Sequence, residues 1–195
     1  GVGSWTQLRH AHDWLFAPRE RPAFQTPGFT VGLLSTLGHM TPRSLDTIGA
    51  MGEQLSAPLV AAALAQRGLP AVLIDARQVL ITDDAFTRAE PIPEMIAERA
   101  RTVLLPVARA GRIPVLGGFI GATAQGITTT LGRGGSDYTA SLVGAALRVD
   151  AIEIWTDVDG MLTADPRVVG GARLIERIRF DEASELASFG AKVLH

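Results

Sequence analysis

Residues 113–147, IPVLGGFIGATAQGITTTLGRGGSDYTASLVGAAL, combine a short apolar run, a glycine-rich segment and a helical pattern. The run at residues 113–116 is apolar at consecutive positions, which is typical of a strand buried on both faces. The pattern of residues 136–147 predicts a helix, and we expect Ser136 or Asp137 to cap its start. A buried strand that leads through glycines into a helix is a recurring unit of α/β folds.

The same alternation extends over the rest of the chain. Short apolar runs occur at residues 29–34, 71–74 and 151–155, and helical patterns occupy residues 41–68 and 92–110. Strands that alternate with helices predict an α/β fold with a largely parallel sheet. Sheets of this kind bind their ligands at the carboxyl ends of the strands.

The helix expected at residues 41–68 has clear local signals. Thr41 and Pro42 form a capping hydroxyl followed by a proline at the first helical position, and Gly68 is a typical end. Pro58 should kink or divide the helix, because proline removes one backbone hydrogen bond. The apolar residues that recur at helical spacing are Leu45, Ile48, Met51 (or Gly52), Leu55 and Leu59.

Composition narrows the functional class. A hydrophobic fraction of 47% and a charged fraction of 19% suit a globular enzyme better than a disordered or fibrous protein. The net charge of −2 gives no support for nucleic-acid binding, so anionic ligands must be bound by local cations and helix ends. The absence of cysteine excludes disulfides and thiolate zinc sites and is compatible with the cytoplasm. There is no signal-peptide pattern or apolar run near 18 residues, so we expect no membrane partner.

The glycine-rich segment predicts an anion-binding site. Its glycines allow backbone N–H groups to approach a phosphate or carboxylate, and the following helix adds its positive end. Arg133 supplies a planar donor for a carboxylate. The segment does not match the Walker pattern, which requires Lys-Ser or Lys-Thr after the last glycine.

Other charged residues are weaker candidates by themselves. Asp157 follows a predicted strand, where an acidic group can hold a ribose, a magnesium ion or an amino group. Arg167 belongs to an Asp-Pro-Arg turn, and Lys192 is the only lysine in the sequence. Glu53 lies in the helix expected at residues 41–68, where it faces either solvent or a site that binds an ammonium group.

Several motifs together resemble those of the aspartate kinases in the amino acid kinase family. The likeness covers roughly residues 41–195 and implies a three-layer α/β/α domain with a mostly parallel central sheet. The motifs, in chain order, are MGE at 51–53, FIG at 119–121, TTTLGRGGSDYTA at 128–140, TDVDG at 156–160, DPR at 165–167 and GAKVLH at 190–195.

The resemblance also implies an activity. Aspartate kinases use ATP and Mg²⁺ to phosphorylate the side-chain carboxylate of L-aspartate, which gives 4-phospho-L-aspartate, a precursor of lysine, threonine and methionine. A cytoplasmic homo-oligomer is expected for the full-length enzyme.

The same resemblance assigns roles to individual residues. Glu53 would bind the α-ammonium group of aspartate, and Arg133 would bind its α-carboxylate. Ser136 and Asp137 would line the catalytic site. The nucleotide contacts implied by the resemblance are Thr156, Asp157, Arg167 and Lys192.

The sequence departs from the family pattern in three places. Leu162 stands where the family often has a tyrosine near the adenine, so an apolar contact is expected there. The opening strand, with its Lys-Phe-Gly-Gly-type loop, and the regulatory domains after GAKVLH are not found. We therefore expect residues 1–195 to be a single, truncated amino acid kinase domain without useful kinase activity of its own.

Two alternatives remain open from the sequence. A related enzyme that phosphorylates another acid, such as an acetylated glutamate, would not need Glu53, because an acetylated amine has no charge to pair. The other alternative is a non-catalytic chain that binds aspartate or a nucleotide.

Overall fold

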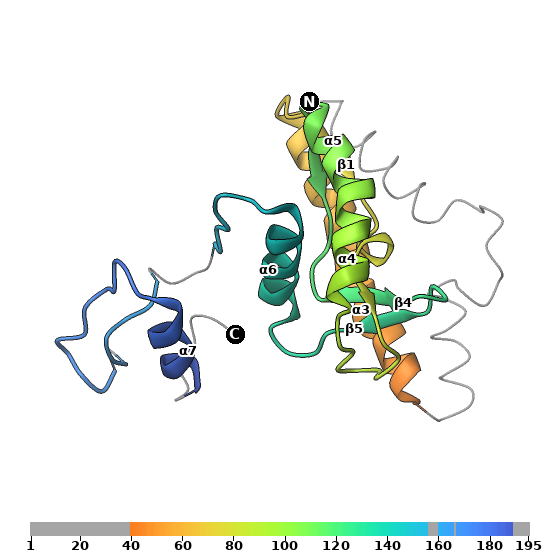
Figure 1. Cartoon of the computed structure of the whole chain (residues 1–195). Helices are drawn as coiled ribbons and strands as arrows, with labels where there is room; N and C mark the ends of the chain where they lie inside the picture. The colour runs from red at the N-terminus through yellow and green to blue at the C-terminus, as the bar shows by residue number, and fades with distance from the viewer. Residues whose placement is uncertain (1–39, 156–159, 166, 189–195) are drawn as a thin grey trace. The chain divides into compact units, whose positions relative to one another are not determined.

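The computed structural model describes residues 40–155, 160–165 and 167–188, and the chain divides into two compact units (Figure 1). The units are Gly1–Asp150 and Ala151–His195. The first contains both sheets and most of the helices.

The first described element, α3 (Pro42–Gln66), begins and ends as its sequence predicts. The Thr41 hydroxyl accepts a hydrogen bond from the Ser44 N–H (3.1 Å), and Gly68 follows the helix with a φ of +81°. Pro58 lies buried inside one continuous helix, so of the two predicted effects, a kink or a division, the division does not occur.

The leucines that recur along α3 do not form its buried face. Leu45, Leu55 and Leu59 are exposed. The residues that α3 buries are Asp46, Ala50, Ala57, Pro58 and Ala61. Small side chains allow the helix to lie close to β1 and β5, which it contacts. The leucine-rich side therefore faces outward.

By length and composition alone, α3 is the one described helix that could cross a membrane. The same helix contacts β1 and β5 and buries the Asp46 carboxylate.

The strands form two small sheets. Strand β1 (Ala71–Leu73) pairs in parallel with β3 (Ile113–Val115). In the other sheet, β4 (Ile120–Thr123) pairs in parallel with β2 (Ile81–Thr82) and antiparallel with β5 (Thr128–Thr130). The predicted strands at 71–74 and 113–116 are therefore confirmed, and parallel pairing predominates. The strand predicted at 29–34 lies outside the described residues.

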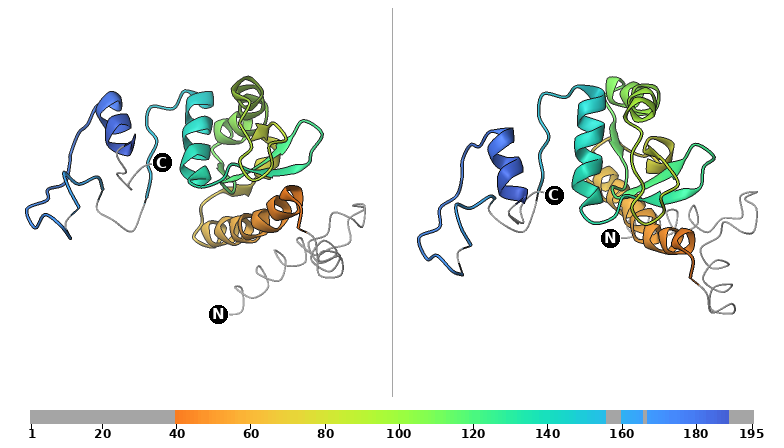
Figure 2. Two further views of the ribbon diagram at one scale, coloured as in Figure 1. Left: turned by 90° about the horizontal axis from the view of Figure 1, so that it is seen from below. Right: turned by 60° about the horizontal axis from the view of Figure 1, so that its bottom comes forward.

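Helices cover the sheets of the first unit on both sides. Figure 2 shows α3 on one side and α4 and α6 on the other, which confirms the three-layer α/β/α fold. The helices of the second layer are α4 (Pro93–Arg99), a π-helical turn (Ala100–Leu104), α5 (Leu105–Arg109) and α6 (Gly135–Leu147). The core between this layer and the strands is built on Val79, Leu80, Ile96, Ala100 and Leu104.

The helix predicted at residues 92–110 is present with a widened turn in its middle. The Leu105 N–H donates to the carbonyl of Ala100, five residues back, which is π-helical geometry. The wide turn lies directly before Pro106, whose missing N–H and bulky ring disturb regular α-helical bonding.

In the second unit, the predicted strand at 151–155 is wrong. This segment has no strand pairing to another described residue, and Ile152 and Trp155 are exposed. An apolar run becomes a strand only when a neighbour completes its hydrogen bonds. The unit instead contains a bridge between Leu162 and Leu174, followed by α7 (Phe180–Ser188).

Replacing Gly52 with alanine should raise the free energy of unfolding by about 0.5–1 kcal/mol, because glycine is costly inside a helix. Gly52 is exposed in α3, and a Cβ added there would meet no atom within 4 Å. Urea denaturation measures the change. The matched control is Gly68→Ala, which should destabilise the protein because Gly68 has a positive φ. A loss of stability in Gly52→Ala would contradict the packing described for α3.

Candidate active site

Two glycines after β3 allow α3 and α6 to approach the same loop. A Cβ added at Gly117 would lie 3.0 Å from the Cβ of Glu53 and 3.3 Å from its Oε2 atom. A Cβ at Gly118 would lie 2.8 Å from the Cα of Ser136. Two predicted site residues, Glu53 and Ser136, therefore lie against adjacent glycines at the carboxyl end of a parallel strand, where α/β proteins bind their ligands.

The start of α6 differs from its prediction. The N-cap is Gly134, in a left-handed conformation with a φ of 75°, and no side chain caps the helix. Ser136 and Asp137 lie inside the first turn, so the prediction that one of them caps the helix is wrong. The reason is the preceding turn, in which the Gly135 N–H donates to the Gly132 carbonyl (3.1 Å). This turn carries Arg133 and leaves the side chains of Ser136 and Asp137 available for a ligand.

A buried hydroxyl joins this turn to the loop after β3. The Thr139 Oγ1 atom accepts from the Phe119 N–H (3.1 Å) and donates to the Gly135 carbonyl (2.7 Å). Phe119 has a φ of 70°, which is strained for a residue with a side chain. Strain of this kind often marks a functional site.

The two charged substrate-binding candidates have no ionic partner within the part of the chain that the structure describes. Glu53 is half-buried and Arg133 is exposed, and neither forms an ion pair with a described residue. The free N–H groups and positive end of α6 lie beside Ser136. The site therefore offers a carboxylate for a cation and an arginine with a helix start for an anion.

The predicted nucleotide contacts lie in the second unit. Arg167 is held by Asp165 through hydrogen bonds of 2.7 and 3.0 Å, and these bonds raise its pKa above the ordinary value. The Asp165 carboxylate also accepts from the Arg167 N–H (2.9 Å). Thr156, Asp157 and Lys192 lie outside the described residues.

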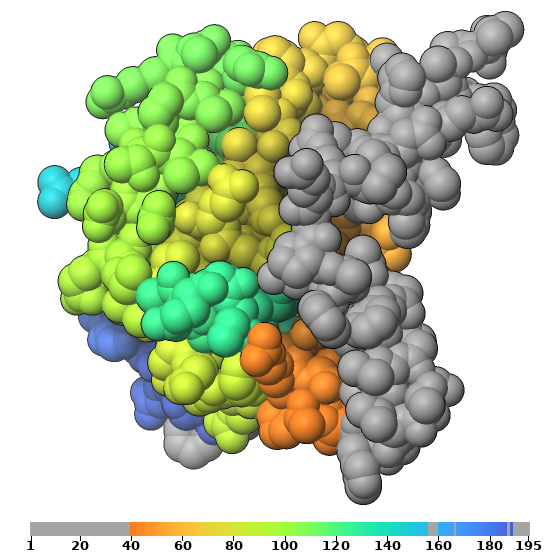
Figure 3. Space-filling view, turned by 90° about the vertical axis from the view of Figure 1, so that its right-hand side faces the viewer, coloured from red at the N-terminus to blue at the C-terminus, as the bar shows by residue number. Residues whose placement is uncertain are grey.

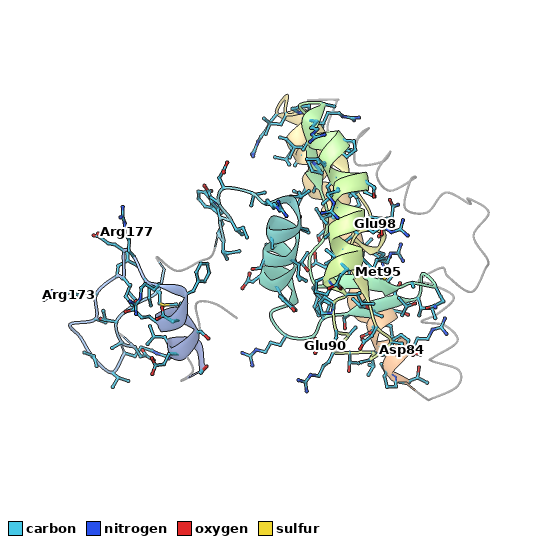
Figure 4. The ribbon with its side chains drawn as sticks, in the orientation of Figure 1. Asp84, Glu90, Met95, Glu98, Arg173 and Arg177 are labelled. Carbon is cyan, nitrogen blue, oxygen red and sulfur yellow. The ribbon has the colours of Figure 1, made fainter. Side chains whose placement is uncertain are left out.

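The second unit contains further arginines. Figure 4 labels Arg173 and Arg177, which both point away from α7. Leu162, the expected adenine contact, is half-buried and pairs with Leu174.

Two features of the site were missed from the sequence. The separate roles of Gly117 and Gly118 were not predicted, although a glycine pair directly after a strand indicates close backbone approach. Asp46 was overlooked, yet it is 1% exposed and accepts hydrogen bonds from Thr87 and Thr130. An acidic residue one helical turn before Ala50, on the alanine-rich face of α3, was the available signal.

Comparison with known proteins gives a consistent result. The profile of the amino acid kinase family matches residues 9–195. Lysine-sensitive aspartokinase 3 of Escherichia coli is 48% identical over 155 residues, which are 80% of this chain and 34% of that protein. An aspartate kinase of Pseudomonas fluorescens is 48% identical over 154 residues, covering 78% of this chain and 36% of that protein.

The structural comparison agrees. The crystal structure of E. coli aspartokinase III in complex with aspartate and ADP matches with a TM-score of 0.78 and 39% identity. The match covers 98% of this chain and 45% of that one. This chain thus spans less than half the length of the relatives that it matches, and it belongs to the amino acid kinase family.

Proposed function

We propose that this chain forms most of the catalytic domain of an aspartate kinase, which transfers the γ-phosphate of ATP to the side-chain carboxylate of L-aspartate. The observation that carries the proposal is that Glu53 and the start of α6 lie against neighbouring residues of one loop, Glu53 at Gly117 and Ser136 at Gly118. The carboxylate of Glu53, the guanidinium of Arg133 and the N-terminus of α6 suit a ligand that has an ammonium group and carboxylates. Aspartate is such a ligand, and a named structural relative binds it together with ADP.

The proposed chemistry needs positioning more than proton transfer. The β-carboxylate of aspartate is already ionised at neutral pH, so no strong general base is required. Glu53 and Arg133 would orient the substrate through its α-ammonium and α-carboxylate groups. Ser136 and Asp137 would then hold the reacting groups in line at the start of α6. Such alignment accounts for much of the rate enhancement in phosphoryl transfer.

The proposed nucleotide contacts rest on the resemblance. We propose that Thr156, Asp157, Arg167 and Lys192 contact ATP. The described residues contain no group of three or more acidic or histidine side chains that could hold a metal ion. Magnesium in kinases needs only one or two carboxylates together with phosphate oxygens, and Asp137 is a suitable carboxylate. When bound, Mg²⁺ would neutralise charge on the transferred phosphate.

The proposal also covers the metabolic role of the product and the location of the enzyme. The product, 4-phospho-L-aspartate, would feed the synthesis of lysine, threonine and methionine. We propose a cytoplasmic enzyme, homo-oligomeric at full length, with L-aspartate and ATP as partners and no nucleic acid or membrane partner.

A coupled assay tests the proposed activity. The full-length protein is incubated with ATP and aspartate, ADP release is recorded, and hydroxylamine traps the acyl phosphate as a hydroxamate. We expect aspartate-dependent ADP release and a stoichiometric hydroxamate. Turnover with N-acetylglutamate instead would favour the related enzyme, and binding without turnover would favour a non-catalytic role.

Replacing Glu53 with glutamine should raise the KM for aspartate about 10- to 100-fold, since a charge-assisted hydrogen bond contributes about 1.5–3 kcal/mol. Inhibition by succinate, which lacks the α-amine, should change little. Steady-state kinetics and succinate inhibition constants check both expectations. The matched control is Glu98→Gln on the exposed side of α4, which should leave both constants unchanged (Figure 4). Equal losses for aspartate and succinate would mean that Glu53 has a structural role.

A further inference from the structure

Asp46 is a buried carboxylate that joins three segments of the first unit. Its Oδ1 and Oδ2 atoms each lie 2.9 Å from the Thr87 N–H. Its Oδ2 also accepts from the Thr130 N–H (3.0 Å), and its Oδ1 accepts from the Thr130 hydroxyl (2.6 Å). Asp46 is 1% exposed. The donors to its carboxylate belong to the loop after β2 and to the strand β5.

These segments lie side by side on one face of the molecule. Figure 3 shows the start of α3 in orange, the β4–β5 hairpin in teal and the loop after β2 in yellow-green. Asp84 and Glu90, labelled in Figure 4, mark the two ends of this loop. Asp46 is therefore placed to set the spacing of the three segments.

Thr87, which donates to Asp46, has a strained backbone and lies next to the turn that carries Arg133. Thr87 has a φ of 73°, a conformation that β-branched residues rarely adopt. Its carbonyl oxygen lies 3.2 Å from the position that a Cβ of Gly132 would take. Gly132 directly precedes Arg133, so the conformation of Thr87 affects where Arg133 is presented.

Asp46 also shares a helix face with Glu53. The two residues are about two helical turns apart, which places their side chains on one side of α3. The hydrogen bonds of Asp46 therefore fix the rotation of the helix that carries Glu53.

We propose that Asp46 is a positioning residue that sets the placement of Glu53 relative to Arg133, and hence the affinity for the acid substrate. This proposal rests on the proposed function. It distinguishes Asp46 from a residue that only stabilises the fold, because a purely structural residue would not affect one substrate selectively.

The main test is Asp46→Asn in the full-length enzyme. Asparagine keeps the size of the side chain, but its NH₂ group would face N–H donors where an acceptor is needed. We expect the aspartate KM to rise tenfold or more while the ATP KM stays within twofold. The matched control is Asp83→Asn. Asp83 accepts from Ala85 and Glu90 within the same loop, and this substitution should leave both KM values within twofold.

A rescue experiment tests the role of Thr87. Glycine adopts a positive φ without strain, so Thr87→Gly reduces the need for Asp46 to hold this turn. The double variant Asp46→Asn, Thr87→Gly should therefore have an aspartate KM at least threefold lower than Asp46→Asn alone. Additive effects of the two changes would contradict the proposed coupling.

Circular dichroism establishes whether each variant is folded. If Asp46→Asn does not fold, Thr130→Val replaces it, because this change removes only the hydroxyl donor. It should raise the aspartate KM at least threefold, and Thr130→Ser should restore it. Folded variants with unchanged KM values, or with equal rises for aspartate and ATP, would overturn the proposal. A wild-type enzyme that does not use aspartate would instead overturn the proposed function itself.

Discussion

Replacing Arg133 with alanine should lower kcat/KM for aspartate roughly 30- to 1,000-fold in the complete enzyme. The loss corresponds to about 2–4 kcal/mol, the range expected when a charged hydrogen-bonded pair is removed. Arg133 forms no ion pair with a described residue, so its charge is available for the α-carboxylate of the substrate. The KM for ATP should remain nearly unchanged.

Initial-rate kinetics with each substrate varied in turn separates the two effects. Arg99→Ala is the matched control, because Arg99 is exposed on α4 and should not affect either KM. Equal losses for aspartate and ATP would show that Arg133 does not recognise the acid.

Gly118→Ala should have the second large effect, on both stability and activity. The added Cβ would lie 2.8 Å from the Cα of Ser136 and 3.3 Å from its carbonyl oxygen, so the backbone at the start of α6 must move. We expect the free energy of unfolding to fall by about 3 kcal/mol, the upper end for overpacking. A displacement near 1 Å in the catalytic site can cost about 100-fold in rate, so kcat should fall by a similar factor.

Urea denaturation and assays at a temperature where the variant stays folded separate stability from activity. Gly170→Ala provides the control, since a Cβ there would meet nothing within 4 Å. Near-normal stability and kcat in Gly118→Ala would mean that the loop and α6 do not approach as closely as described.

Local sequence signals predicted the helix ends and strands correctly where these depend on residues nearby in the sequence. The start of α3 at Thr41 and Pro42, and its end before Gly68, depend on groups within a few residues and were correct. The strands β1 and β3 were also found, because each is a short apolar run with clear boundaries.

Features that depend on distant neighbours were missed. The Thr128–Thr130 run was interpreted as part of a glycine-rich loop, although β-branched residues are typical of strands and this run is β5. The leucine spacing predicted the helix but not its inward face, because the position of Asp46 and the close approach to β5 turn the alanines inward. Nothing local to residues 41–68 indicates where Thr130 will lie.

The candidate site was predicted in part. Glu53, Arg133, Ser136 and Asp137 were named from motifs, and the structure brings Glu53 and Ser136 to one loop. What joins them is backbone proximity at Gly117 and Gly118, which a motif does not describe.

The Asp46–Thr130 contact also has a consequence for synthesis on the ribosome. The two residues are 84 positions apart, and chains elongate at roughly 5–20 residues per second. Thr130 is therefore added about 4–17 s after Asp46. During that interval α3 cannot bury Asp46 with all of its donors, because the N–H and hydroxyl of Thr130 are missing and only the Thr87 N–H can pair with the carboxylate. We therefore expect the nascent helix to stay undocked until the β4–β5 hairpin has emerged from the exit tunnel.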